Sequence, residues 1–144
     1  MAAATETATP FIITKIRPPM VSAGKTTQQL GTVGKLDMGV QVVAPNDGDT
    51  NLHAHPGLDT AWVVIDGQAE FYSTGDEVVA TLNKNETIMI PAGAPYWFKA
   101  SSSTPLVILH VVCIGENYKR SSRIDYKPRN DQPHNALTGT FYES

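Results

Sequence analysis

The sequence has little cysteine, little net charge and no long apolar run, and each shortage excludes a class of protein. Cys113 is the single cysteine in 144 residues, so no internal disulfide can form, and its apolar surroundings (HVVCIG) predict a buried, inert thiol. The formal net charge is −3, which argues against nucleic acid or an anionic membrane as the main partner. No apolar run approaches the roughly 20 residues that span a bilayer. The start, MAAATETATP, lacks the features of a signal peptide, so we expect a cytoplasmic protein.

Helical periodicity is also missing, because no long segment repeats its apolar residues every three to four positions. Instead the chain has short runs of β-branched and aromatic residues separated by Pro, Gly, Asn and Asp. Closely spaced short strands of this kind predict an all-β, antiparallel barrel with no substantial helix. The predicted strands contain FIITKI, VQVVA, TAWVVI, AEFY, EVVATL, TIMI, YWFKA and PLVILHVVCI.

The chain length fits one domain with a short tail at each end. Residues 1–9 are small and polar and are expected to be disordered, residues 10–117 form the barrel, and residues 118–144 pack on it or on a partner subunit. The segment SAGKTT (22–27) ends like a phosphate-binding loop but lacks the first glycine and a following helix, so we interpret it as a polar connection. The FIITKI strand is the best candidate for exchange between two copies, which predicts a homodimer.

The segment HAHPGLDTAWVVIDG carries the most specific chemistry in the sequence. His53 and His55 are two positions apart, so on an extended strand their imidazoles point to one face and can converge on one ion. Neutral imidazole suits Zn, Fe, Cu and Ni and, less selectively, Mn. A turn precedes the pair and a Pro-Gly turn follows it, which places both histidines at the mouth of a barrel, where ligands bind.

These residues resemble the first motif of the cupin superfamily, which has a glycine, His-x-His, a glutamate and a closing glycine. Here Gly48, the two histidines and Gly67 match. The glutamate position falls on Thr60, which cannot supply a carboxylate, and Asp59 lies one residue earlier.

A second cupin motif has a glycine, Pro-x-Gly, a histidine and an asparagine. Pro91-Ala92-Gly93 matches it, whereas Asn85, Tyr96 and Ala100 occupy the other positions. Asn85 can adopt the left-handed conformation that favours glycine. The resemblance covers roughly residues 36–115 and implies the small antiparallel barrel of RmlC-like cupins.

The resemblance also implies a divalent transition metal (Fe, Mn, Zn or Ni) held by histidines and a carboxylate, of which only His53 and His55 carry over. Three residues could complete the set. Asp59 could do so if a bulge turned it inward, and Tyr96 could be a ligand or a general acid. His110, inside the apolar run PLVILHVV, is either a third imidazole ligand or base, or a core histidine satisfied by one hydrogen bond.

The neighbouring residues predict a small-molecule pocket with Thr60, Trp62 and Phe98 on its wall, although inward aromatic residues also simply fill small barrels. Three functions remain open. The first is a metal-dependent lyase, isomerase or dioxygenase acting on a small oxygen-rich molecule. The second is a metal-free epimerase or dehydratase that uses His/Tyr acid–base chemistry. The third is a barrel that binds a small molecule without catalysis.

Overall fold

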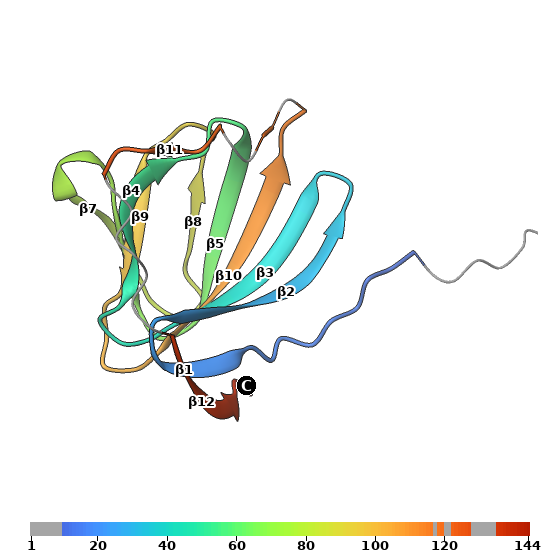
Figure 1. Cartoon of the computed structure of the whole chain (residues 1–144), viewed down its shortest axis with the longest axis vertical. Coiled ribbons are helices and arrows are strands. Elements are labelled where there is room, and N and C mark those ends of the chain that lie inside the picture. The colour runs from blue at the N-terminus through green and yellow to red at the C-terminus, as the bar shows by residue number, and fades with distance from the viewer. Residues whose placement is uncertain (1–9, 117, 120–121, 128–134) are drawn as a thin grey trace, which may run out of the picture.

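The computed structural model describes residues 10–116, 118–119, 122–127 and 135–144, and it confirms the all-β prediction (Figure 1). The described helix is one turn of 3₁₀ helix, Thr74–Asp76. Among the described residues, no helix is long and apolar enough to cross a membrane. The strands are β1 (Pro19–Ala23), β2 (Lys25–Val33), β3 (Leu36–Val43), β4 (Gly48–Ala54), β5 (Leu58–Asp66), β6 (Ala69–Tyr72), β7 (Val78–Leu82), β8 (Thr87–Ile90), β9 (Tyr96–Ala100), β10 (Leu106–Ile114), β11 (Ile124–Asp125) and β12 (Ala136–Phe141).

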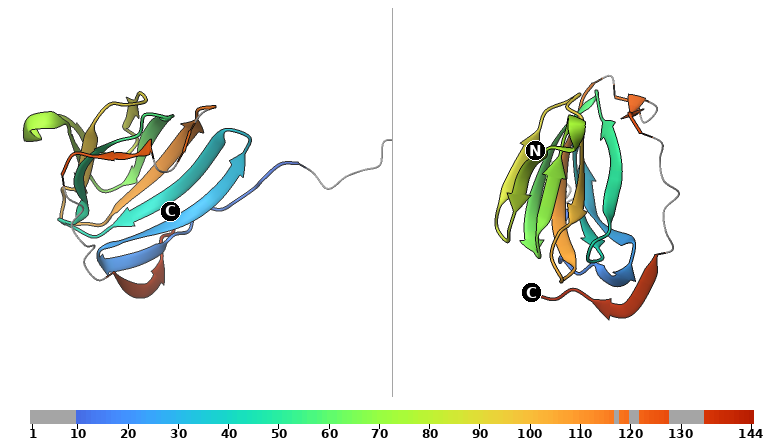
Figure 2. Two further views of the ribbon diagram at one scale, coloured as in Figure 1. Left: turned by 45° about the horizontal axis from the view of Figure 1, so that its top comes forward. Right: turned by 90° about the vertical axis from the view of Figure 1, so that its left-hand side faces the viewer.

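Two five-stranded antiparallel sheets face each other (Figures 1 and 2). The first has the strand order β2-β3-β10-β5-β8, and the second has the order β11-β4-β9-β6-β7. Strands β1 and β12 form a separate pair. Strands that are neighbours in a sheet are mostly far apart in sequence, so the fold depends on long-range pairing.

The main core lies between the two sheets, where each strand contributes alternate residues. Its largest fully buried side chains include Trp62, Phe71 and Phe98. The Trp62 and Phe98 rings have centroids 4.9 Å apart, and those of Phe71 and Phe98 are 5.1 Å apart. Burying side chains of this size contributes about 1.5–3 kcal/mol each, so this cluster is a principal source of stability.

A second apolar cluster covers the outer face of the first sheet. It includes Val40, Val42 and Val107, whose side chains alternate with those of the main core. Residues Met20 and Tyr142, from opposite ends of the chain, pack against it. Residues from the N-terminal and C-terminal segments therefore cover the outer face of the first sheet, which points away from the main core.

Two segments differ from the sequence predictions. The FIITKI segment is extended but forms no strand, and it lies along β2, where Thr14 Oγ1 donates a hydrogen bond to the carbonyl of Leu30 (2.7 Å). Lys25–Val33 is strand β2 and not a connection, because it pairs with β3 along its whole length. The turn before it is made by Gly24, whose φ of +73° suits glycine.

The C-terminal segment packs on the same chain at two places. Strand β11 adds to the second sheet beside β4, and β12 pairs with β1. The predicted disorder of residues 1–9 concerns residues outside the described part of the chain.

Candidate functional site

A register shift in β4 shapes the candidate site. Between the pairs Asp49–Phe98 and His53–Tyr96, β4 advances by four residues while β9 advances by two. Such bulges re-aim side chains and occur next to active sites. The result is that Asn51 and His53 are both buried, with exposed fractions of 4% and 2%.

The bulge fixes the protonation pattern of His53. Its Nδ1 lies 2.9 Å from the carbonyl oxygen of Asn51. A carbonyl oxygen only accepts hydrogen bonds, so Nδ1 carries the proton in this contact and Nε2 is the unprotonated nitrogen of the neutral ring. Metal-binding histidines are commonly oriented by a bond of this type, and the same tautomer also suits a general base.

His55 follows β4 and connects the two sequence motifs. Its carbonyl oxygen accepts hydrogen bonds from the amides of Leu58 (3.3 Å) and Gly93 (3.1 Å). Gly93 has φ of +85°, and Asn85 has φ of 70°, as its replacement of a motif glycine predicted. The Pro-Gly turn of the first motif is therefore fastened to the turn of the second.

Tyr96 opposes His53 in the β4–β9 ladder, and its side chain is buried on the same face. The centroid of its ring lies 4.6 Å from that of His53 and 6.5 Å from that of His55, and the two histidine rings are 4.9 Å apart. A cavity of about 170 Å³ lies between β6, β8 and β9, and Tyr96 is part of its lining. Because β9 separates β4 from β6, the cavity is on the side of Tyr96 away from β4. The structure thus brings two imidazoles and one phenol together.

Asp59 does not join them. The β5–β10 ladder is regular from Leu58 to Val64, with no bulge that could turn Asp59 inward, and Asp59 pairs with Cys113 on the outer face. Its carboxylate accepts a hydrogen bond from the amide of Ala92 (2.8 Å). Asp59 therefore stabilises the turn of the second motif from the outer face of the sheet. The same alternation exposes Cys113, and the prediction of a buried thiol is wrong.

His110 lies on the inner face of β10, opposite Trp62. The two rings stack with centroids 3.7 Å apart and an interplanar angle of 3°. Burial, and then the positive charges of nearby His55, His53 and Lys25, lower the pKa of His110 to about 4, although Asp37 opposes them. Its Nε2 is buried and has no hydrogen-bond partner in the described part of the chain. Whether His110 is a ligand, a base or a core histidine satisfied by one hydrogen bond stays a prediction.

Three predicted pocket residues are tightly packed. Trp62 and Phe98 belong to the main core, and Thr60 is 5% exposed between Ile90 and Val112. Their side chains point inward, as strand alternation requires, and they pack in the core beside the candidate site. Any role in binding a substrate stays a prediction.

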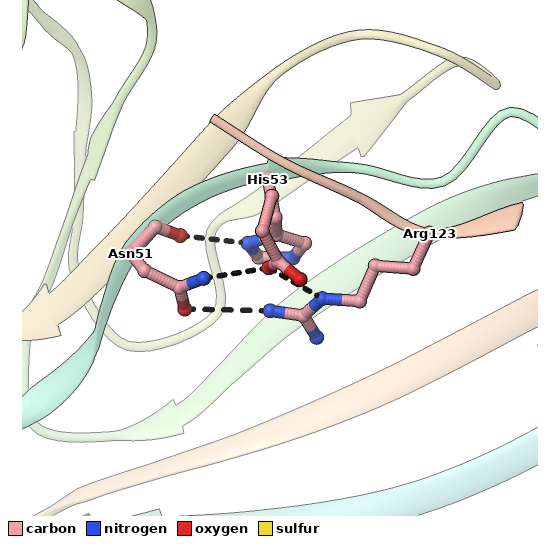
Figure 3. Close-up of polar contacts among 4 residues, drawn as sticks. Asn51, His53 and Arg123 are labelled. Atoms are coloured by element: carbon pink, nitrogen blue, oxygen red, sulfur yellow. Dashed lines mark hydrogen bonds and ion pairs between the residues drawn. The ribbon is translucent and has the colours of Figure 1, made fainter. Parts of the chain in front are cut away.

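A polar network beside His53 was missed by the sequence analysis (Figure 3). The side chain of Asn51 donates to the Asp125 carboxylate (2.7 Å) and accepts from Arg123 Nη2 (3.3 Å), and Arg123 Nε contacts the same Asp125 oxygen (3.0 Å). Asp125 opposes His53 in the β4–β11 ladder, so both side chains are on the inner face. The only sequence signal is the alternation of Arg123 and Asp125 around Ile124.

The donors at this site differ from the set that the cupin resemblance implies. Among the described residues, no three His, Cys, Asp or Glu side chains are close enough together to hold a metal ion. The structure brings the rings of His53, His55 and Tyr96 together, and the Asp125 carboxylate is engaged by Asn51 and Arg123. Two imidazoles and a phenol could hold an ion with open positions for substrate, but not a closed structural site.

Two facing antiparallel sheets with a core between them define a small β-barrel protein. A family model described as a cupin domain matches residues 39–112. The chain therefore belongs to the cupin family, and its fold is the double-stranded β-helix.

Solved structures agree with this assignment. The chain is similar to a double-stranded β-helix protein from Klebsiella pneumoniae (TM-score 0.61, 19% identity, covering 73% of this chain and 86% of that one). It is similar to a conserved protein of unknown function from Streptococcus pyogenes (0.56, 23%, 67% and 80%). It is also similar to a recombinant oxalate oxidase in complex with glycolate (0.54, 17%, 63% and 51%). No curated protein matches the chain significantly. At these identities the likeness shows the fold alone.

Proposed function

We propose that the chain is a cupin enzyme of the lyase, isomerase or dioxygenase type that acts on a small oxygen-rich molecule, with His53 and His55 as its working imidazoles. The observation that carries this proposal is the bond from His53 Nδ1 to the carbonyl of Asn51, which fixes the tautomer. Bonds of this kind orient metal-binding histidines and catalytic bases, because they leave the other ring nitrogen, Nε2, as the unprotonated one. The oxalate oxidase with glycolate is an enzyme of similar fold.

His53, His55 and Tyr96 would hold a divalent Fe, Mn, Zn or Ni ion. Such an ion supplies a Lewis acid that polarises a carbonyl or enolate oxygen. The chain's own residues complete the chemistry. Whichever of the three side chains does not bind the ion would hold or move a proton at the substrate, and the buried Trp62 and Phe98 rings exclude water from the barrel interior.

A second candidate is a metal-free enzyme that uses the same imidazoles as bases and Tyr96 as an acid. One observation favours it specifically: Thr60 replaces the motif glutamate and Asp59 faces outward, so no carboxylate replaces it from that strand. A phenol and an imidazole on one inner face suit proton transfer in an epimerisation or dehydration.

The deciding experiment is elemental mass spectrometry of protein purified without an affinity tag. We expect close to one equivalent of metal in the wild type and none in His53→Ala/His55→Ala. His110→Phe is the matched control, because it removes an inner-face imidazole that is stacked on Trp62 and not grouped with the pair.

Absence of metal from the wild type, even after reconstitution with Fe, Mn, Zn or Ni, would contradict the metal-dependent reading. Turnover of a substrate panel that His53→Ala/His55→Ala abolishes would then support the metal-free enzyme. Binding of a small molecule without turnover would support the third function, a barrel that binds a ligand without catalysis.

We also propose that the protein is a homodimer. An exposed apolar surface, which we call the arm patch, joins the N-terminal arm to the tips of β2 and β3 around a cavity of about 460 Å³. Its exposed members are Phe11, Ile12, Ile13, Val33, Leu36 and Met38. Apolar patches of this kind mark protein interfaces, and a second copy would bring its own arm patch to this one.

Light scattering after size exclusion tests the dimer. Phe11→Asp should convert it to a monomer, whereas Met89→Asp, at another highly exposed apolar residue outside the arm patch, should not. A monomeric wild type would refute the proposal. The cytoplasmic location stays a prediction.

A further inference from the structure

We propose that Arg123 binds the carboxylate group of the substrate, so that the ligand of the barrel is a small carboxylic acid. The inference rests on the proposed function, because it places this ligand beside His53. It adds a residue from the C-terminal segment, outside both cupin motifs, to the binding site.

The first argument is the placement of Arg123. The β4–β11 ladder pairs Asp125 with His53, and Arg123, which comes just before β11, bonds to Asp125 and to Asn51 of β4. Figure 3 shows the Arg123 guanidinium bonded to Asn51, in the same polar network as His53. Its side chain is only 20% exposed, although it carries a full charge.

The second argument is how the guanidinium is held. Nε contacts Asp125 (3.0 Å) and Nη2 donates to Asn51 (3.3 Å), so one edge of the group is fixed by β11 and β4. A guanidinium has five N–H donors in a planar fork. These two contacts use two of them, and the remaining donors lie at the Nη end of the fork. A planar end of this kind matches the two oxygens of a carboxylate.

The third argument concerns charge. Asp125 already offsets part of the Arg123 charge, so a singly charged anion suits the site better than a doubly charged phosphate. His110 has a pKa of about 4 and is neutral at pH 7, so it adds no positive charge to the inner face. One guanidinium that is already paired with Asp125 favours one carboxylate.

The test compares acids with their amides. Lactate and 2-oxobutyrate, each beside its primary amide, are titrated into the wild type, Arg123→Gln and Arg123→Lys by calorimetry or ligand-detected NMR. We expect the acids to bind the wild type more tightly than the amides, and Arg123→Gln to weaken acid binding about 10- to 100-fold without changing amide binding. Arg123→Lys should give an intermediate loss, because it keeps the charge but not the fork.

The matched control is Lys127→Gln, which removes the same formal charge from an exposed ion pair with Asp76. It should leave acid binding unchanged. Three results would each overturn the inference: acids and amides that bind alike, Arg123→Gln that binds acids within about twofold of the wild type, or no acid that binds the wild type with Kd below about 10 mM. Tighter binding of methyl phosphate than of lactate would overturn it too.

The comparison within the wild type needs no variant, so a folding defect in Arg123→Gln cannot hide the answer. Failure of the proposed function is seen separately, in the metal content and turnover of His53→Ala/His55→Ala. Acids that bind that double variant through Arg123, without metal or turnover in the wild type, would support the inference and contradict the enzyme.

Discussion

The titration of His110 should make the stability of this protein depend on pH, and the variant His110→Phe should remove that dependence. Phenylalanine keeps an aromatic ring against Trp62, where the imidazole stacks at 3.7 Å, but it cannot bind a proton. Burial is the first cause of the lowered pKa, followed by the positive charges of nearby residues. The folded protein therefore favours the neutral ring.

The sign follows from proton counting. The pKa of His110 is 6.5 when unfolded and about 4 when folded, so between these values the unfolded chain binds more protons. Stability from this group is complete above about pH 6.5, is lost as the pH falls toward 4, and changes no further below that. The difference corresponds to about 3 kcal/mol.

The assay is urea unfolding of the wild type and His110→Phe in the presence of a chelator, at several pH values between 7.5 and about 4. The quantity compared is the difference between the two free energies of unfolding, which cancels the carboxylates common to both proteins. We expect the wild type to lose about 3 kcal/mol relative to the variant across this range. A difference that does not change with pH, or an NMR titration of His110 near pH 6.5, would refute the reasoning.

Three further predictions concern residues outside the candidate site. Asp59→Ala should remove the bond to Ala92 and cost about 0.5–1.5 kcal/mol in denaturant unfolding, while the metal content stays unchanged; a loss of bound metal would contradict its outward placement. Gly67→Ala should cost about 1–3 kcal/mol, because φ is +83° and the new Cβ would lie 2.6 Å from the carbonyl oxygen of Pro105; an unaltered unfolding midpoint would oppose this. Cys113 should react with a maleimide in the folded protein, and protection until unfolding would show that it is covered in solution.

Much of the fold could be predicted because its signals are local. Alternation placed Trp62 and Phe98 inward, and Asn85 was expected to be left-handed for a reason that depends only on its own side chain. The prediction that Cys113 is buried was wrong because it considered only the apolar neighbours in sequence, and these neighbours belong to both faces of β10. Even on the central strand β10, an apolar run does not bury every member, because Cys113 lies on the outer face.

The candidate site could be predicted only in part because several of its contacts join distant segments. The bulge in β4 and the pairing of β11 with β4 both depend on how strands far apart in sequence meet. Asn51 and Arg123 are 72 positions apart, and each alone resembles an ordinary surface residue. Polar residues that meet in a partly buried network leave little trace in composition or periodicity.

The titration of His110 should report metal binding at the candidate site. The Asp37 carboxylate, which accepts a bond from Gln29 (2.6 Å), raises the pKa of His110, whereas nearby positive charges lower it. The nearest positive influences on His110 come from His55 and His53, after burial itself. A dication bound by that pair would lower the pKa of His110 further, because like charges repel. A carboxylate on Arg123 should leave it nearly unchanged, because neither Arg123 nor Asp125 is among the groups that shift the pKa of His110. A displacement of the NMR-observed titration by metal but not by acid would thus distinguish the two events, and no displacement by metal would contradict binding of the ion by His53 and His55.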